Sequence, residues 1–323
     1  MSQTLGATMP ALPSYVIVTP ARNEAQFIEP TIKSVLAQTI RPLKWVIVSD
    51  GSTDGMDDIV RKYAAEHAWI ELLRMPERRE RHFAGKVHAF NAGYARLVGL
   101  PYEVIVNLDA DVSFGEDYFS FLLQRLAEDS QLGLVAGRLV DVASNQSYNY
   151  EITGNEYVSG PCQVFRRECF EVIGGYRPLK SGGVDVVAVL SARASGWQTR
   201  AFTEKPYHHH RPMNGAQMKG VRERLHTGKK AYLLGSHPVW EIVRSVYVMG
   251  KRPYVIGGIL IFIGYFWSFF CRVERTIPRE LMKFRHRDQM ARLKTVFRRF
   301  ALGSIPTVSL RGHKAAGTHF DQW

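Results

Sequence analysis

Cysteine is scarce in this chain of 323 residues, which contains only Cys162, Cys169 and Cys271. No C-x-x-C pair and no Cys/His spacing typical of zinc sites is present, and three scattered thiols do not make a disulfide framework. The start of the chain, MSQTLGATMPALPSYVIV, lacks the basic stretch and the long apolar stretch of a secretory signal. We therefore expect most of the chain to lie in a reducing cytoplasm.

Glycine-rich phosphate loops are also missing. Neither G-x-G-x-x-G after the first apolar run nor G-x-x-x-x-G-K-S/T occurs in the sequence. Both loops bind phosphates through closely approaching backbone amides, so their absence argues against a dinucleotide-dependent oxidoreductase and a P-loop NTPase.

Acidic residues are scarce in the C-terminal third. Residues 1–218 contain 22 Lys and Arg against 24 Asp and Glu, a balance of −2. Residues 219–323 contain 20 against 6, a balance of +14, so the net charge of +12 comes from this third. Such asymmetry indicates an anionic partner, either nucleic acid or a membrane surface.

An apolar segment lies within this basic third. Residues 253–271, PYVIGGILIFIGYFWSFFC, form nineteen uncharged positions followed by Arg272. This length just suffices to cross a bilayer, or the segment can lie in the interface. Nucleic acid does not explain it, so we expect contact with the cytoplasmic face of a membrane and no nucleic-acid partner. A buried core helix is the alternative.

A second segment of this third, residues 282–300, mixes apolar side chains with many cations, as an interfacial helix does. A solvated basic helix packed on its own domain is the alternative. The apolar residues of the segment 282–300 are Met282, Phe284, Met290, Leu293, Val296 and Phe297.

The first 112 residues alternate between strand and helix patterns. Short β-branched runs at 14–20, 44–52 and 103–110 are separated by amphipathic spacing at 24–39, 55–67 and 86–98. This order predicts an α/β fold with a mostly parallel sheet flanked by helices and a ligand site at the carboxyl ends of the strands.

Two carboxylates, Asp109 and Asp111, directly follow the apolar strand at 103–110. Buried carboxylates are costly unless they are paired, hydrogen-bonded or bound to a metal. A divalent cation that neutralises a diphosphate leaving group would use such a pair. An Asx-type turn before the next helix is the alternative.

Six motifs in order resemble the family 2 glycosyltransferases. They are TPARNE, VSDGSTD, GKVHAFNAG, NLDADV, GGVDVVAVLSARASGW and HHHRPMNG. The similarity also extends through YVSGPCQVFRRECFEVIGGY and covers most of residues 14–215. The resemblance implies the GT-A (Rossmann-like) fold, with a nucleotide-sugar-binding catalytic domain at 1–218 and a helical, basic, membrane-associating region at 219–323.

The resemblance also assigns donor and metal residues. Asp50, which follows a buried strand and precedes Gly51, reaches the base or ribose, whereas Asp54 suits the role of helix cap better. The resemblance implies Mn²⁺ or Mg²⁺ as cofactor, held by Asp111 and, further along, a histidine. Asp109 faces the ribose or the metal. The remaining donor residues implied are Pro20, Arg22, Glu24 and Lys86, whereas Asn91 and Gly93 match the pattern but can serve helix packing alone.

The acceptor needs a base, and Asp185 is the candidate in GGVDVVAVLSARASGW. Related enzymes carry an acidic neighbour here, but Val184 and Val186 flank Asp185 in this chain. Capping of the following helix is the alternative role.

Three adjacent histidines occur at 208–210, and alternate side chains of an extended segment point to opposite faces. The H-x-R pattern favours His209 as metal ligand, two residues before Arg211, while His208 and His210 stay open.

The resemblance implies an inverting, metal-dependent transfer of one sugar from a nucleotide sugar, with UDP expected and GDP or dTDP open, to a membrane-linked glycan or lipid-diphosphate acceptor. The Q-x-x-R-W element of processive synthases is missing, and RERLH stands in its place. Two alternatives remain: a sugar nucleotidyltransferase, although TPARNEA has no glycine, and a non-catalytic basic protein that binds membranes or RNA. Peripheral, monotopic and single-span association with the membrane are all open.

Overall fold

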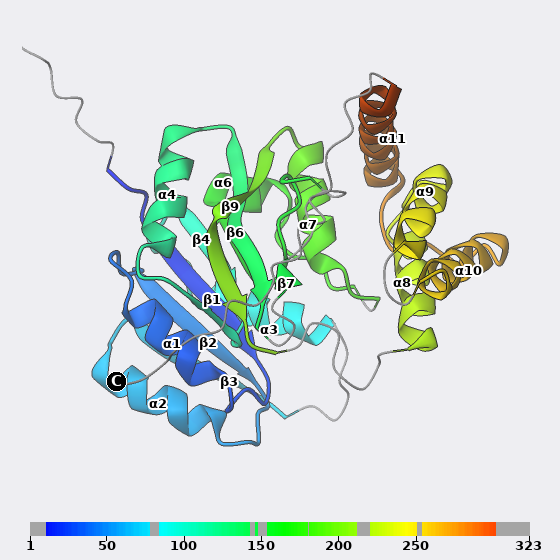
Figure 1. Ribbon diagram of the computed structural model, residues 1–323. Helices are drawn as coiled ribbons and strands as arrows, with labels where there is room; N and C mark the ends of the chain where they lie inside the picture. Colours follow the sequence, from blue (N-terminus) through cyan, green and yellow to red (C-terminus); the bar gives the residue numbers. More distant parts are fainter. Residues whose placement is uncertain are drawn as a thin grey trace, which may run out of the picture.

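The computed structural model shows a large mixed sheet covered by helices, with a separate group of helices beside it (Figure 1). The strand order is β3-β2-β1-β4-β8-β6-β9-β5, and the short β7 pairs with β6 at the side of this path. The structure describes residues 11–77, 84–142, 146–147, 154–179, 181–211, 220–250 and 254–301.

The N-terminal half of the sheet is parallel. Its strands are β3 (Ile70–Met75), β2 (Lys44–Asp50), β1 (Tyr15–Ala21) and β4 (Val104–Leu108). The connecting helices are α1 (Ile28–Leu36), α2 (Met56–Glu66) and α3 (Ala84–Ala95). The α/β fold expected from the alternating pattern is therefore confirmed, and β3 is a strand that the pattern did not predict.

The second half of the sheet brings in antiparallel pairing. Strand β8 (Cys162–Arg166) runs antiparallel to β4 and to β6 (Leu132–Asp141), while β9 (Gln198–His209) runs parallel to β6. The three-residue β5 (Val112–Phe114) then pairs antiparallel with the end of β9. Strand β7 covers Gln146–Ser147. This last pairing places the DAD motif beside the histidine run.

Side-chain alternation divides the core into two layers, one on each face of the sheet. In β1, Tyr15 and Ile17 belong to the layer under α1, α2 and α4 (Tyr118–Glu128), whereas Val16 and Val18 belong to the opposite layer. The second layer lies under α3, α6 (Arg167–Val172) and α7 (Val184–Ala194). All seven residues of β1 are buried, as expected for a strand with helices on both faces.

Helix α3 lies unusually close to the sheet at Gly93. A Cβ at this position would lie 2.7 Å from methyl carbons of both Val18 and Val48. Gly93 therefore serves helix packing, one of the two roles left open by the sequence.

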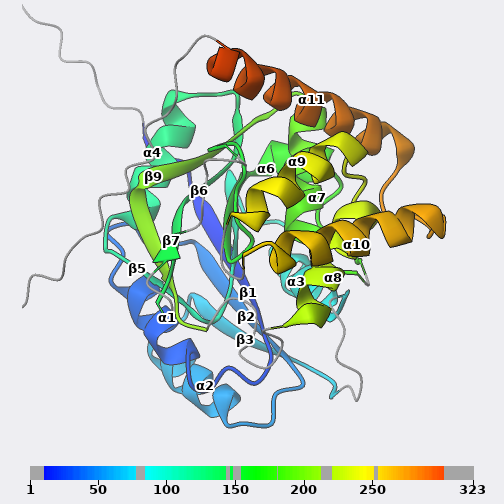
Figure 2. The ribbon, with the colours of Figure 1, turned by 45° about the vertical axis from the view of Figure 1, so that its right-hand side comes forward.

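Four helices form the C-terminal region: α8 (Val221–Leu233), α9 (Pro238–Met249), α10 (Ile256–Phe270) and α11 (Arg279–Ala301). Figure 2 shows them gathered on the α7 side of the sheet. They contact the α/β part through an apolar cluster that includes Val187 and Leu190 of α7 and Leu234, Ile277 and Leu281 of the C-terminal region. The guanidinium of Arg193 also donates two hydrogen bonds to Asp288, at 2.6 and 3.0 Å.

Helix α10 accounts for most of the apolar segment 253–271, of which residue 253 lies outside the described residues. It has 15 residues. One face, which includes Ile261 and Tyr265, is buried against the neighbouring helices, and the other exposes apolar side chains such as Phe262 and Trp267. The buried face agrees with the alternative of a core helix, and contact of the exposed apolar face with a membrane stays a prediction. Among the described residues, no helix combines the length and the apolar character needed to cross a bilayer.

Helix α11 contains the basic segment expected at 282–300 and extends slightly beyond it. Leu281 and Leu293 are buried against the rest of the protein, whereas Val296 and Phe297 are exposed. The helix therefore packs on its own domain along one face and leaves apolar side chains near its end in contact with solvent.

Glycines allow α8 and α10 to touch backbone to backbone. A Cβ at Gly228 of α8 would lie 2.0 Å from the carbonyl oxygen of Ile261, and one at Gly264 of α10 would lie 2.1 Å from that of Leu225. Real Cβ atoms do not approach an oxygen so closely, so any side chain at either position forces the helices apart.

Replacement of Gly228 by alanine tests this contact. Helix propensity alone favours alanine by about 1 kcal/mol. We expect the opposite sign, a loss of about 1–3 kcal/mol in the free energy of unfolding, because the added methyl overpacks the interface. Urea denaturation followed by circular dichroism measures the change.

Gly250→Ala is the matched control, because among the described residues the nearest neighbour of its Cβ would be the carbonyl oxygen of Tyr247, at 3.5 Å. We expect this variant to change stability by less than about 0.5 kcal/mol. A Gly228→Ala protein at least as stable as the parent would contradict the close contact.

Candidate functional site

A cavity of about 530 Å³ opens at the carboxyl ends of β1, β2 and β4. Such strand ends are the usual place for a ligand in an open α/β sheet. The residues that line it include all the predicted donor and metal residues: Pro20, Arg22, Glu24, Asp50, Lys86, Asp109, Asp111 and His209. The structure therefore brings together side chains that lie up to 189 positions apart in the sequence.

The loops after β1 and β2 are tied to each other. The side-chain oxygen of Asn23 accepts a hydrogen bond from the Thr53 amide at 2.9 Å, and the Asn23 amide donates to the Ser52 hydroxyl at 3.1 Å. The Ala25 amide donates to Asp54 at 2.8 Å. Asn23 adopts a left-handed conformation (φ 55°), which asparagine tolerates better than most residues. These bonds fix the wall of the cavity that contains Arg22 and Asp50.

Asp50 and Asp54, the two acidic residues that follow β2, lie in different surroundings. The carboxylate of Asp54 accepts a hydrogen bond from the Met56 amide at 3.1 Å, so it caps the start of α2. Asp50 lines the cavity instead, and its residue is 6% exposed.

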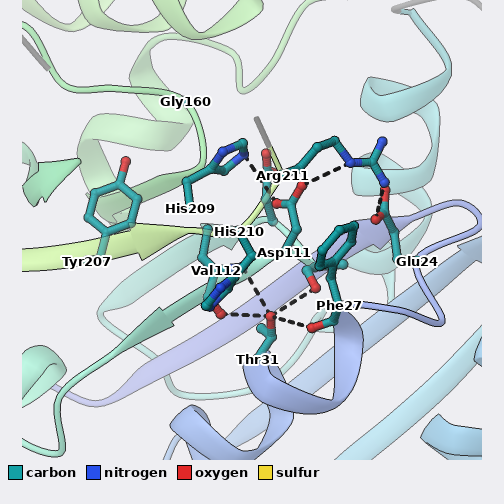
Figure 3. A network of polar contacts seen from close by, with 12 residues as sticks. Glu24, Phe27, Thr31, Asp111, Val112, Gly160, Tyr207, His209, His210 and Arg211 are labelled. Atoms are coloured by element: carbon teal, nitrogen blue, oxygen red, sulfur yellow. Dashed lines mark hydrogen bonds and ion pairs between the residues drawn. The ribbon is translucent and has the colours of Figure 1, made fainter. Parts of the chain in front are cut away.

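The turn at Asp109–Asp111 is held from below by Thr31 of α1. The Thr31 hydroxyl lies 2.9 Å from the carbonyl oxygen of Ala110 and 2.7 Å from that of Val112, and it accepts a hydrogen bond from the Val112 amide at 3.2 Å (Figure 3). Thr31 was not predicted as a site residue, because a single buried threonine carries no pattern in the sequence. Its role is to position the two aspartates.

Asp109 is paired with Lys86, whose ammonium group donates a hydrogen bond to it. Burial raises the pKa of Asp109, and Lys86 offsets part of that rise. Desolvation lowers the pKa of Lys86, but the carboxylates of Asp109, Asp111 and Asp185 outweigh it and leave a net rise. Lys86 therefore stays cationic inside the cavity.

Asp111 faces His209 and Arg211. Its Oδ1 lies 3.4 Å from Nε2 of His209, and its Oδ2 lies 3.5 Å from Nε of Arg211 (Figure 3). Asp111 Oδ1 and His209 Nδ1 are buried, and neither has a hydrogen-bond partner among the described residues. Unsatisfied buried polar atoms are rare in native proteins, so these two groups suit a ligand that the protein alone does not supply.

The three histidines point in different directions, as expected for an extended segment. His209 is 8% exposed and lines the cavity. Its neighbour His208 is exposed, and His210 lies beside Ser113, with 2.8 Å between His210 Nε2 and the hydroxyl. Of the three, the structure brings His209 to Asp111.

Arg211 also lines the first cavity, although the sequence pattern H-x-R pointed to His209 and gave Arg211 no role of its own. Its guanidinium forms an ion pair with Glu24 and lies over the ring of Phe27, 5.6 Å from its centroid. Burial raises the pKa of Glu24 to about 7, because desolvation exceeds the effect of Arg211. The H-x-R pattern was the available signal for Arg211.

A second cavity, of about 480 Å³, adjoins the first and shares Lys86, Asp109, His209 and Arg211 with it. Asp185 lines this second cavity from the first turn of α7. The Tyr157 hydroxyl donates a hydrogen bond to Asp185 Oδ2 at 3.3 Å.

Gly160 faces Asp185 closely, since a Cβ there would lie 3.0 Å from that of Asp185. Asp185 thus lies against both Tyr157 and Gly160 in the lining of the second cavity. Tyr157 and Gly160 were not predicted as site residues, although both lie in the segment YVSGPCQVFRRECFEVIGGY, through which the family resemblance extends.

The three predicted metal ligands do not form a complete set. Within the described part of the chain, no group of three His, Cys, Asp or Glu side chains is arranged to hold a metal ion. Asp109 is engaged by Lys86, which leaves Asp111 and His209 as the pair that faces one another.

Comparisons with known proteins agree with this architecture. Residues 16–161 match the family model for glycosyl transferase family 2. An uncharacterized glycosyltransferase of Nostoc sp. is 31% identical over 180 residues, which cover 49% of this chain and 52% of the relative. Poly-beta-1,6-N-acetyl-D-glucosamine synthase of Staphylococcus aureus is 29% identical over 115 residues, which cover 36% of this chain and 26% of the synthase. The chain thus spans about half of the first relative and a quarter of the second.

Solved structures share the fold. TarS of S. aureus (residues 1–349) aligns with a TM-score of 0.53 at 13% identity, covering 80% of this chain and 72% of the solved 1–349 segment. The mannosyltransferase PcManGT from Pyrobaculum calidifontis, solved with GDP-Man and Mn²⁺, aligns with a TM-score of 0.50 at 17% identity, covering 92% of this chain and 85% of that enzyme. The family match and these likenesses lead to one conclusion: residues 16–161 of the chain are similar to glycosyl transferase family 2, and its α/β part has the GT-A fold.

Proposed function

We propose that this protein is an inverting, metal-dependent glycosyltransferase that moves one sugar from a nucleotide sugar to an acceptor at a membrane surface. The observation that carries the proposal is the pair of adjoining cavities, one lined by Asp50 and Asp111 and the other by Asp185. The cavities share Lys86 and His209, so a donor in the first presents its anomeric carbon toward the second.

The first cavity suits a nucleoside diphosphate. Asp50 and Pro20 line the wall at the tips of β1 and β2, where they can contact the nucleoside, and the cations of Lys86 and Arg211 lie nearer to the second cavity, where the diphosphate would sit. UDP is the expected nucleotide. TarS has also been solved with UDP and with UDP-GlcNAc, and PcManGT with GDP-Man, which supports a nucleotide-sugar donor.

The donor atoms at Asp111 and His209 fit a divalent cation. A carboxylate oxygen and an imidazole nitrogen 3.4 Å apart, one without a hydrogen-bond partner among the described residues, form a half-site that the diphosphate oxygens and water can complete. Bound Mn²⁺ or Mg²⁺ would supply charge neutralisation for the departing diphosphate. Asp109 as a further ligand stays a prediction.

In this proposal Asp185 is the general base. As the acceptor oxygen forms its bond to the anomeric carbon, the bond to the diphosphate oxygen breaks, the diphosphate keeps that electron pair, and the acceptor proton moves to Asp185. Attack from the face opposite the leaving group inverts the configuration. Tyr157 holds one carboxylate oxygen of Asp185 and so orients the other.

Asp185→Asn removes the base while preserving the shape of the side chain. We expect turnover to fall about 10²–10⁴-fold, the usual contribution of a general base, with little change in the Kd for the nucleotide sugar. Steady-state kinetics and calorimetric titration of the donor measure the two effects. Asp58→Asn, at an exposed position of α2, is the matched control. Unchanged turnover in Asp185→Asn would rule out the assigned role.

His209→Ala tests the metal half-site. We expect the Mn²⁺-dependent gain in nucleotide affinity to drop at least about tenfold, because loss of a ligand or its support typically costs that much. Titration of UDP with and without Mn²⁺ measures this gain. His208→Ala removes an adjacent, exposed imidazole and should behave like the parent. Equal losses in the two variants would refute a specific role for His209.

The acceptor is expected at a membrane, as a membrane-linked glycan or lipid diphosphate. Helices α9 and α10 expose apolar side chains that include Ile242, Val246, Phe262 and Trp267. The adjacent α11 exposes cations at Lys283, Arg287, Lys294 and Arg298. Each cation near an anionic leaflet contributes about 1 kcal/mol, so this combination supports peripheral or monotopic association with the cytoplasmic face.

Exchange of Phe262 and Trp267 for aspartate tests membrane association. We expect the fraction of protein bound to vesicles with anionic lipid to fall at least about tenfold, because both the apolar contact and the charge balance worsen. Vesicle flotation at low and high salt measures it. Val98→Asp, at an 83% exposed site of the α/β part, is the control. Undiminished flotation of the double variant would exclude this face as the contact.

A further inference from the structure

A third cavity, of about 370 Å³, lies between α7 and the C-terminal helices and is unusually rich in cations. It adjoins the Asp185 cavity, since Lys230 lines both. Tyr157, which donates to Asp185, lines it as well. Its cations are Arg193, Lys230, Arg244, Arg285 and Arg292.

Three of these arginines already have acidic partners. Arg193 and Arg292 both bind Asp288, and Arg292 also lies 3.3 Å from Glu156. Arg244 lies 2.9 Å from the buried carboxylate of Glu241. These pairs shape the wall and contribute little net charge.

Lys230 and Arg285 differ from them. Among the residues that the structure describes, neither cation has an acidic side chain within ion-pair distance, and Arg285 donates only to the carbonyl oxygen of Leu234. Desolvation lowers the pKa of Arg285 to about 10. Two partly buried cations without carboxylate partners are costly, and a bound anion would remove that cost.

The position of Lys230 connects this charge to the reaction site. Its side chain packs against Gly183 at the start of α7, where a Cβ would lie 3.1 Å from Lys230 Cε. Asp185 lies two residues further along. An acceptor with its reacting hydroxyl at Asp185 therefore has its neighbouring groups at Lys230.

The third cavity also borders the apolar face of α9. Trp240 and Arg244 line the cavity, while Val239, Ile242 and Val246 of the same helix are exposed. An anionic group in the cavity can thus continue into an apolar chain along α9.

We infer that this cavity is an anion site, formed around Lys230 and Arg285, that binds a phosphate or diphosphate group of the acceptor while its hydroxyl meets Asp185. The inference rests on the proposed function for the identity of the acceptor. The charge chemistry itself is common to a phosphate carried by a lipid and to one carried by a water-soluble molecule.

Calorimetric titration with inorganic pyrophosphate tests the site. EDTA keeps metal from bringing pyrophosphate into the acid-rich donor cavity. We expect the full-length protein to bind pyrophosphate and Lys230→Gln to bind it about tenfold more weakly, as expected for one lost charge-assisted hydrogen bond. Lys229→Gln makes the same charge change at an exposed position of the same helix and should bind as the parent does.

Lys230→Arg keeps the charge and should keep most of the affinity, which separates loss of the site from loss of folding. Equal affinities for Lys230→Gln and Lys229→Gln would overturn the inference, as would no binding by the parent.

Farnesyl diphosphate in place of pyrophosphate distinguishes the two sources. Tighter binding by at least about tenfold supports a lipid-borne group, because the chain adds apolar contact. Equal affinity supports the anion site with a water-soluble acceptor.

Titration with a nucleotide sugar and Mn²⁺ separates this inference from the proposed function. If the parent protein binds pyrophosphate but no nucleotide sugar, the anion site is supported and the proposed function is refuted. If it binds a nucleotide sugar but no pyrophosphate, only the anion site is refuted.

Discussion

The structure depends on how four carboxylates are kept together at one edge of the sheet. Glu24, Asp50, Asp109 and Asp111 line one cavity, where their mutual repulsion and desolvation oppose folding. Lys86 compensates Asp109, and Arg211 links Glu24 to Asp111. The negative charge of Asp111 is compensated only in part, because its Oδ1 is buried without a hydrogen-bond partner among the described residues. The folded chain thus retains a local excess of negative potential suited to a cation.

Topology brings Arg211 and His209 to these carboxylates. Arg211 and His209 lie about a hundred residues after Asp111, yet the pairing of Val112 with His209 brings them beside it. Strand β5 has only three residues, so this contact is short and depends on what surrounds it. Thr31 supports it by holding the backbone at Ala110 and Val112. A helix on one face of the sheet therefore controls the geometry of the charged cluster at its edge.

Much of the first half of the fold could be predicted from sequence, because β-branched runs ending in Pro20, Asp50 or Asp109 mark both a strand and its functional tip. The residues of the ordered motifs likewise meet in two adjoining cavities. Strand β3 escaped prediction because Glu71 and Arg74 interrupt its apolar pattern at the edge of the sheet. Thr31, Tyr157 and Lys230 were not predicted as site residues for another reason. Their places at the cavities depend on tertiary contacts, and a threonine, tyrosine or lysine is too common a residue to mark a site by itself.

The glycine contact between α8 and α10 has a mechanical consequence. With the backbones in contact at Gly228 and Gly264, the two helices have no compressible layer of side chains between them. A force on the outer face of α10 therefore moves α8 as well, because no side-chain layer between the two helices can rearrange to accommodate it. Lys230 is only two residues from Gly228 and lines the cavity that contains Asp185. A shift of α8 therefore moves the wall of that cavity.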